Sequence, residues 1–177
     1  MSNPSLQTPV IGIVEHVSID GRTIGSRAID VPAKIDTGAD SSSIWATQVE
    51  VSQDGMLRFC LFGPSSEHYT GKVLTRVDFS VSRVKNSTGH SEIRYKTHFT
   101  VTIGGKKIKA MFNLSDRSNN TYKILIGRRT ISKKFLVDVS MHASRLPKPD
   151  KSAQLRKHLL KNPYEFHESH DKNLRGA

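Results

Sequence analysis

The chain is poor in cysteine: among its 177 residues only Cys60 is present, which excludes an internal disulfide. It also lacks an apolar run of the roughly 18 residues that a membrane-spanning helix needs. Residues 1–9 do not show the charged and then apolar pattern of a secretory signal. We therefore expect a cytoplasmic protein without a membrane segment.

Three hydrolase signatures are missing as well. The sequence has eight histidines but no His-Glu-x-x-His motif, and His167 and His170 fall in a polar C-terminal stretch. It has no Gly-x-x-x-x-Gly-Lys phosphate loop, and Cys60 lacks the surroundings of a nucleophilic cysteine. We expect no catalytic metal and no bound cofactor.

What the chain does contain is one Asp-Thr-Gly, at residues 36–38, between two apolar segments typical of strands. A carboxylate dyad needs two aspartates, so the second must come from another subunit. Two facing carboxyl groups cannot both ionise, and one would stay protonated as acid while the other activates water as base. This pattern predicts a peptidase that works as a homodimer.

The residues around the carboxylate have physical roles in such a pairing. Asp36 would be the catalytic residue. Thr37 can send its hydroxyl to a backbone group of the partner turn, and Gly38 lets two turns approach without a Cβ clash. The alternative is an ordinary turn between strands, since Asp and Gly are common turn residues.

A second segment, Ile124-Leu125-Ile126-Gly127, is a short apolar strand closed by glycine and followed by a helix-compatible stretch at residues 129–134. In this order, Asp-Thr-Gly-Ala-Asp and then Ile-Leu-Ile-Gly-Arg, residues 10–140 resemble a retropepsin, the retroviral-type aspartic protease. The resemblance implies that Ile126 and Gly127 support the aspartate turn.

The same resemblance adds Ala39 to the active-site scaffold. It further implies an ion pair between Asp40 and Arg128 that braces the active-site loop near the dimer contact.

Residues 83–95 and 135–138 are similar to a bacterial and archaeal branch of retropepsin-like proteins, often named ATP-dependent zinc protease. Some members accompany a ligase that adds glutamate tails to a ribosomal protein, and their implied role is to trim those tails. The resemblance therefore implies a glutamate-tailed protein substrate. One departure is Asp40-Ser41, where many members have a basic residue and Thr.

The formal net charge of +11 agrees with an acidic substrate, because a basic cleft concentrates anionic partners. Arginine also binds carboxylates through two parallel hydrogen bonds. We expect Arg83, Lys85, Arg94 and Lys123 to bind substrate, since they fall in or near the segments that the family uses around its site. Each of them could instead lie on a solvated strand face.

Turn signals between alternating segments predict an all-β closed barrel. The expected strands are residues 10–19, 22–30, 33–36, 43–51, 56–62, 72–84, 91–103 and 106–114, with a hairpin turn at Asp20-Gly21. One short helix should follow the Ile-Gly-Arg strand. The loop at residues 86–89 is a candidate flap over substrate, or a plain hairpin tip.

The predicted organisation is a flexible N-terminus at residues 1–9, the retropepsin-like domain at 10–140 and a basic tail at 141–177. In the tail we expect a short helix near residues 151–161 and poor order from residue 164 onward. The tail could contact an anionic surface such as ribosomal RNA.

Two function classes remain open. The first is an aspartic peptidase in which Asp36 from each subunit of a symmetric dimer activates water. The second is a non-catalytic basic β-barrel that binds RNA or an acidic protein partner and keeps a vestigial turn.

Overall fold

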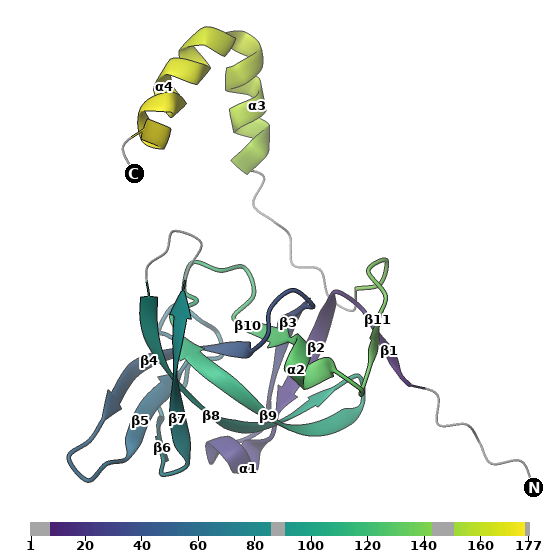
Figure 1. Cartoon of the computed structure of the whole chain (residues 1–177), viewed down its shortest axis with the longest axis vertical. Coiled ribbons are helices and arrows are strands. Elements are labelled where there is room, and N and C mark those ends of the chain that lie inside the picture. Colours follow the sequence, from purple (N-terminus) through teal and green to yellow (C-terminus); the bar gives the residue numbers. More distant parts are fainter. Residues whose placement is uncertain (1–7, 86–90, 143–150, 176–177) are drawn as a thin grey trace, which may run out of the picture. The chain divides into compact units, whose positions relative to one another are not determined.

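The computed structural model describes residues 8–85, 91–142 and 151–175, apart from the side chains of residues 84, 85, 151–154 and 170–175. The chain divides into two compact units, residues 1–146 and 147–177. The first unit carries all the strands that the structure describes, and the second consists of helices (Figure 1).

The first unit is built on a closed six-stranded β-barrel, which confirms the predicted all-β barrel. Its strands are β2 (Val14–Ile19), β3 (Ile29–Asp36), β4 (Ser42–Val51), β8 (Ser91–Ile103), β9 (Lys106–Ser115) and β10 (Ile124–Gly127). Around the ring the order is β10, β3, β2, β8, β9 and β4, and β4 pairs with β10 to close it. The β10–β3 and β4–β9 pairs are parallel, and the other pairs are antiparallel.

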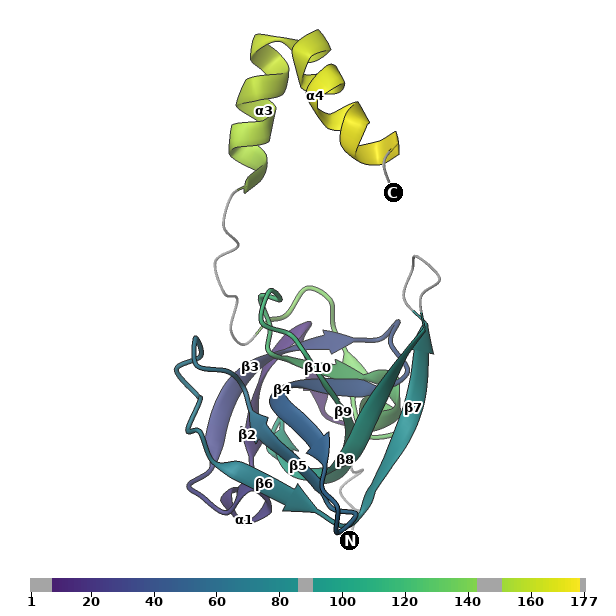
Figure 2. The same cartoon turned by 90° about the vertical axis from the view of Figure 1, so that its left-hand side faces the viewer.

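Three strands extend this barrel. β5 (Leu57–Leu61) pairs with β4, and β6 (Val73–Arg76) pairs with β5. β7 (Phe79–Lys85) pairs with the first half of β8, and the two strands form a long twisted hairpin (Figure 2). The predicted flap at residues 86–89 lies outside the described residues.

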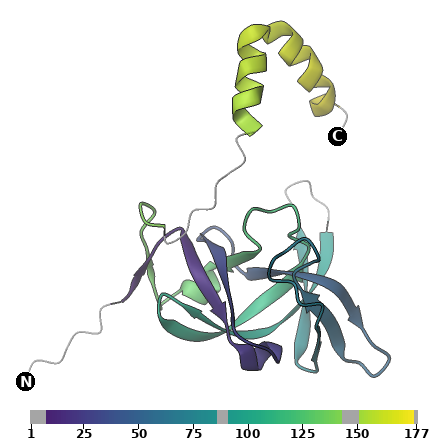
Figure 3. The same cartoon turned by 180° about the vertical axis from the view of Figure 1, so that it is seen from behind.

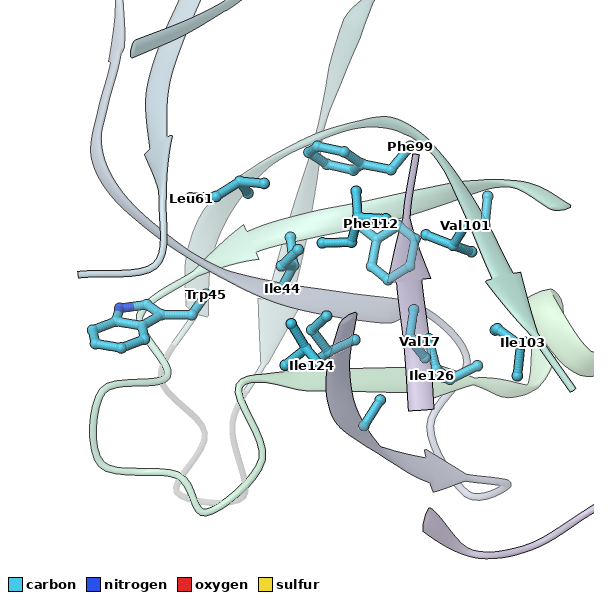
Figure 4. Close-up of a cluster of buried hydrophobic side chains, with 14 of the residues drawn as sticks. Val17, Ile44, Trp45, Leu61, Phe99, Val101, Ile103, Phe112, Ile124 and Ile126 are labelled. Atoms are coloured by element: carbon cyan, nitrogen blue, oxygen red, sulfur yellow. The ribbon is translucent and has the colours of Figure 1, made fainter. Parts of the chain in front are cut away.

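The core fills the barrel with apolar side chains that alternate along its strands (Figure 4). β8 turns Phe99, Val101 and Ile103 inward, and each of them is at most 1 % exposed. The ring of Phe112 from β9 meets Phe99 edge-on, with centroids 5.8 Å apart. Burial of each such side chain contributes about 1.5–3 kcal/mol, so the core strongly fixes the register of the strands that carry the aspartate turn.

A small parallel sheet joins the two ends of the first unit, where β1 (Val10–Ile11) pairs with β11 (Leu136–Val137) (Figure 3). The helix α2 (Arg128–Ile131) follows β10 directly. The short helix predicted after the Ile-Gly-Arg strand is therefore confirmed, although it begins one residue earlier and ends sooner than the predicted stretch.

The predicted hairpin turn at Asp20-Gly21 is wrong. The one-turn helix α1 (Gly21–Ile24) occupies this position, because the Asp20 carboxylate accepts a hydrogen bond from the Arg22 N–H at 2.9 Å and so caps the helix. Gly25, with φ of 59°, ends it in the left-handed conformation. The returning strand consequently begins at Ile29 rather than at residue 22.

The predicted strand over residues 72–84 is divided into β6 and β7, with a bend at Val77 and Asp78. The first part pairs with β5 and the second with β8. The Thr97 hydroxyl donates to the Asp78 carbonyl at 2.9 Å and fixes the bend. One alternating segment thus serves two different neighbours.

The second unit is a pair of helices, α3 (Lys151–Lys161) and α4 (Pro163–Arg175). α3 confirms the predicted helix, but the expected poor order beyond residue 164 is wrong. The Asn162 side chain accepts a hydrogen bond from the Glu165 N–H at 3.2 Å, and Pro163 takes the first helical position, so a second helix starts there. None of the helices in the described part of the chain combines the length and apolar character that a membrane crossing requires.

Candidate active site

The aspartate turn lies where two strands that are distant in sequence run side by side. β3 ends at Asp36, and β10 runs parallel to it with Ile126 opposite Ile35 and Gly127 opposite Asp36 (Figure 1). Ile126 is fully buried in the core. The structure therefore places Ile126 and Gly127 beside the turn, as the resemblance implied.

The carboxylate of Asp36 is held by its own turn. Its Oδ1 accepts hydrogen bonds from the backbone N–H groups of Gly38 and Ala39, both at 3.2 Å. Lys34 Nζ lies 3.6 Å from Oδ2, and the Asp36 side chain is 27 % exposed. The carboxylate is thus fixed on one oxygen and still accessible to solvent, while Thr37 and Gly38 lie exposed at the tip of the turn.

Gly127 lies against the loop that follows the turn. A Cβ on Gly127 would stand 2.5 Å from the carbonyl carbon of Ser41 and 2.9 Å from the carbonyl oxygen of Ala39, so only glycine fits. Gly38 differs, because a Cβ there would meet Oδ1 of Asp36 at 3.5 Å, an ordinary contact. Within one chain, the turn therefore does not require a glycine at position 38.

The expected ion pair between Asp40 and Arg128 is present. Backbone hydrogen bonds run beside it: the Arg128 N–H donates to the Ala39 carbonyl at 2.8 Å, and the Arg129 N–H donates to the Asp40 carbonyl at 3.2 Å. Both side chains of the ion pair are at least half exposed, and such pairs contribute about 0–1 kcal/mol. The backbone bonds are the firmer connection between the loop and α2.

A buried pair of hydroxyls that no sequence motif marks braces the same loop. Ser42 Oγ lies 2.7 Å from Thr130 Oγ1 and accepts a hydrogen bond from the Gly127 N–H at 3.0 Å. Ser42 is 1 % exposed. The hydroxyl therefore ties the start of β4 to both β10 and α2.

Arg117, in the loop between β9 and β10, also lies near the site, and no sequence motif predicts this. Its Nε donates to the Tyr122 carbonyl at 3.2 Å, and its Nη1 donates to Ser43 Oγ at 3.1 Å. Burial lowers the pKa of its guanidinium, the positive charge of Arg94 lowers it further, and the Asp36 carboxylate raises it. Arg117 is therefore within electrostatic reach of both Arg94 and Asp36.

The structure separates the predicted substrate-binding residues of the hairpin. Arg94 is opposite Ser82, whereas Arg83 is opposite Ile93. Because side chains alternate between the faces of a strand, Arg83 and Arg94 point to opposite faces. The side chain of Lys85, at the end of β7, is outside the described part of the structure.

Lys123, the fourth predicted substrate-binding residue, braces a loop. Its Nζ donates to the carbonyl oxygens of Arg117, Ser118 and Asn120 at 3.3, 2.7 and 2.8 Å, and it lies 4.9 Å from the centre of the Trp45 ring. An ammonium has three N–H donors, so these bonds use all of them. Lys123 thereby stabilises the loop that positions Arg117.

The face of the hairpin that carries Arg94 is connected to the active-site loop. Ser82 Oγ donates to Asn113 Oδ1 at 2.9 Å, and Asn113 Nδ2 donates to the Ser42 carbonyl at 3.3 Å. Asn113 is buried between β8 and β4. Arg94 rather than Arg83 is therefore on the side of the hairpin that is joined to this loop.

Within the described ranges, no three His, Cys, Asp or Glu side chains gather closely enough to hold a metal ion. His16 and His98 each lie near one aspartate, with Nδ1 2.9 Å from Asp30 and 3.6 Å from Asp78. The turn that carries the Asp36 carboxylate is contacted by the second motif through Gly127, and the loop after it is held by hydrogen bonds from α2 and β10.

Comparison with known proteins assigns the barrel to a family. The family model RimB-like, described as "Retropepsin-like aspartic endopeptidase RimB", matches residues 10–148. The chain belongs to this family. The match spans the barrel, the aspartate turn and α2, so every residue of the site described above lies inside it.

Two curated relatives are both named "Probable alpha-L-glutamate ligase". The chain is 30 % identical over 119 residues to the protein from Shewanella pealeana and 29 % identical over 119 residues to that from Shewanella halifaxensis. Each match covers 64 % of this chain and 26 % of the relative, so the chain spans about a quarter of the relatives' length.

A crystal structure of a protein of unknown function from Legionella pneumophila has the same fold. It matches with a TM-score of 0.58 at 22 % sequence identity, over 77 % of this chain and 97 % of that one.

Proposed function

We propose that this protein is an aspartic peptidase that works as a symmetric dimer, with one Asp36 from each subunit sharing a water molecule. The observation that carries the proposal is the geometry of the turn. Asp36 is fixed through Oδ1 by two backbone N–H groups, while Thr37 and Gly38 stand exposed at its tip. A second turn of the same shape can approach there along a two-fold axis.

An exposed apolar strip supports association of two subunits. It consists of Val10, Ile13, Leu136, Val139 and Met141, which are between 37 % and 76 % exposed. Val10 pairs with Leu136, and the Ile13 N–H donates to the Met141 carbonyl. The Ile13 carbonyl also accepts from the Ile35 N–H at 2.9 Å, so the strip adjoins the strand that ends at Asp36. Burial of this strip by a second copy would bring the two turns near the same axis.

In the proposed reaction, the ionised Asp36 of one subunit takes a proton from water, and the resulting hydroxide adds to the carbonyl carbon of a peptide bond. The partner's Asp36, which is protonated, gives its proton to the carbonyl oxygen. In the collapse of the tetrahedral diol, the partner's Asp36, now ionised, takes a proton from one hydroxyl as the C=O bond re-forms. The C–N bond breaks, and the nitrogen leaves with the proton held by the first Asp36. Each turn holds its carboxylate at fixed orientation through the Gly38 and Ala39 amides.

We infer that the substrate is rich in glutamate. Arg117 brings a positive charge within electrostatic reach of Asp36. The Nη2 of Arg94 pairs with Glu92 at 3.0 Å, but its Nε is buried without a hydrogen-bond acceptor among the described residues. A buried donor of this kind indicates a missing acceptor, and a glutamate carboxylate would supply one. The names of the Shewanella relatives support the same chemistry, since a glutamate ligase makes the bonds that such a peptidase would cleave.

The test is incubation of the purified protein with a protein that carries a poly-glutamate tail, followed by mass spectrometry. The wild type should shorten the tail, and Asp36→Asn should not. A heterodimer with one Asp36→Asn subunit should be nearly inactive, because the site is shared. Full activity of a monomer, or cleavage by Asp36→Asn, would contradict the proposal. RNA affinity that falls with salt, retained in Asp36→Asn while neither protein cleaves, would favour a non-catalytic binding module.

A further inference from the structure

A cleft of about 190 Å³ lies on the outer face of the barrel, beside the loop that follows the aspartate turn. The loop contributes Ser41, β8 contributes Lys96, β9 contributes Lys109, and α2 contributes Arg129. Three of these side chains are cations. The described residues that line the cleft include no acidic side chain.

The cations of this cleft have little counter-charge. Among the described residues, neither Lys96 nor Lys109 forms an ion pair with a carboxylate. Arg129 has Asp40 at 3.9 Å, but Asp40 is already paired with Arg128. Like charges gathered without a partner repel one another, and a bound anion would relieve that repulsion.

The cleft is also continuous with the basic surroundings of Asp36. Lys96 lies two residues after Arg94 on β8, so both side chains point to the same face, about 6.6 Å apart along the strand. An extended peptide presents every second side chain at the same interval. Arg94 in turn lies within electrostatic reach of Arg117, and Arg117 within reach of Asp36. Cationic side chains therefore flank both the carboxylate and the cleft, and Arg94, which also pairs with Glu92 at 3.0 Å, shares a strand face with Lys96.

We propose that the cleft formed by Lys96, Lys109 and Arg129 binds a glutamate side chain of the substrate, several residues away from the bond that is cleaved. The inference rests on the proposed peptidase function and adds a recognition site to it. The same peptide chain would pass Arg94 on its way from Asp36 to the cleft.

Distance and size both agree with this occupant. Ser41 lies against Gly127, the register partner of Asp36, so its Cα atom is at most about 10 Å from that of Asp36, a distance that an extended peptide covers in about three residues. The cleft is smaller than the 300–1,000 Å³, roughly, of pockets that hold drug-sized ligands. It suits a single carboxylate side chain better than a nucleotide. The protein should therefore prefer glutamate tails that extend more than about three residues beyond the cleaved bond.

The test measures binding without cleavage, in the Asp36→Asn background. Fluorescently labelled peptides that end in about ten glutamates or in a single glutamate would be titrated and followed by anisotropy, since a single residue beside Asp36 is too short to reach the cleft. Lys96→Gln/Lys109→Gln should weaken binding of the long tail about five- to tenfold, because each exposed ion pair is modest. The short tail should bind equally to both proteins.

The matched control is Lys106→Gln/Lys133→Gln, which removes the same charge from two exposed lysines that do not line the cleft. It should change the affinity for the long tail less than about twofold. Should Lys96→Gln impair folding, the single variants Lys109→Gln and Lys106→Gln, three residues apart on β9, give the same comparison.

Equal affinities of the cleft and control variants would overturn the proposal. So would an RNA oligonucleotide that competes with the peptide and loses affinity in the cleft variants, because the cleft would then bind phosphates. In the active protein, the cleft variants should raise KM for long tails and leave kcat unchanged. If the wild type binds long tails through the cleft but cleaves none, the peptidase proposal fails and the binding site stands.

Discussion

Gly127 and Asp36 are register partners on adjacent parallel strands, and Gly127 is also the residue over which the loop after Asp36 folds. The missing side chain at position 127 allows the backbone of Ala39 and Ser41 to lie against β10. Two short motifs that are far apart in the sequence thus form one structural unit. The orientation of the Asp36 carboxylate depends on both of them.

Gly127→Ala should destabilise the fold. Its Cβ would stand 2.5 Å from the carbonyl carbon of Ser41, so β10 and the loop would have to separate. Strain of this kind typically lowers the free energy of unfolding by about 1–3 kcal/mol. The matched control is Gly38→Ala, where the Cβ has room, and its change should stay within about 0.5 kcal/mol. Urea denaturation of both variants provides the measurement, at a protein concentration low enough to keep the protein monomeric so that contacts of Gly38 with a second turn do not contribute. Equal midpoints would refute the prediction.

Ser42→Ala should also be costly, although it removes only one oxygen. The change leaves the Gly127 N–H and the Thr130 hydroxyl without their buried partner, a loss of about 1–3 kcal/mol. Ser41→Ala is the control, because Ser41 is exposed and should be nearly neutral. Hydrogen exchange offers a local readout, since the Gly127 amide should exchange faster only in Ser42→Ala. Indistinguishable exchange in the two variants would show that the hydroxyl does not hold this amide.

The sequence alone predicted those features that depend on residues close together in the chain. Alternating apolar residues predicted most barrel strands, and the Asp-Thr-Gly and Ile-Gly-Arg motifs predicted the position of the turn and of α2. The Asp40–Arg128 ion pair followed from the family resemblance and is present. Each of these features depends on a few neighbouring residues, so a linear motif can carry it.

Features that depend on contacts between distant segments could not be predicted. Arg117 reaches Ser43 only because the loop after β9 folds over the start of β4. Lys123 donates hydrogen bonds to three backbone carbonyl groups of the same loop. The presence of a lysine at this position of the sequence does not predict these bonds.

The second helix of the tail, in contrast, has a local signal in the sequence, because Asn162 is an N-cap residue followed by a proline.

Asp20 should make the free energy of unfolding depend on pH in the acidic range. Hydrogen bonds from Lys107 and then from Arg22 hold the pKa of this carboxyl well below the ordinary value of 3.8. A carboxyl whose pKa is lower in the folded state stabilises the fold fully above the unfolded pKa and loses this effect as the pH falls toward the folded one. Asp20→Asn keeps a side-chain oxygen for the helix cap but removes the charge.

The difference in unfolding free energy between wild type and Asp20→Asn should therefore shrink as the pH is lowered from about 6 to about 2. Urea titrations over this pH series give the difference directly. Lys107→Gln should show the same trend, because it removes the group that contributes most to the lowered pKa. A difference that stays constant with pH would mean that the charge of Asp20 does not stabilise the fold.

Arg117→Gln should reveal whether the guanidinium near Asp36 recognises substrate. If the proposed peptidase prefers glutamate beside the cleaved bond, loss of this charge should raise KM for glutamate tails about tenfold, the equivalent of about 1.4 kcal/mol. A substrate without glutamate near that bond should show no such increase. Arg117→Lys, which keeps the charge but not the forked donors, should give a KM between those of the wild type and Arg117→Gln.

Arg27→Gln, at an exposed arginine outside the site, is the control for net charge. An equal loss of kcat on both substrates, with KM unchanged, would instead assign Arg117 to the positioning of the active-site loop through Ser43.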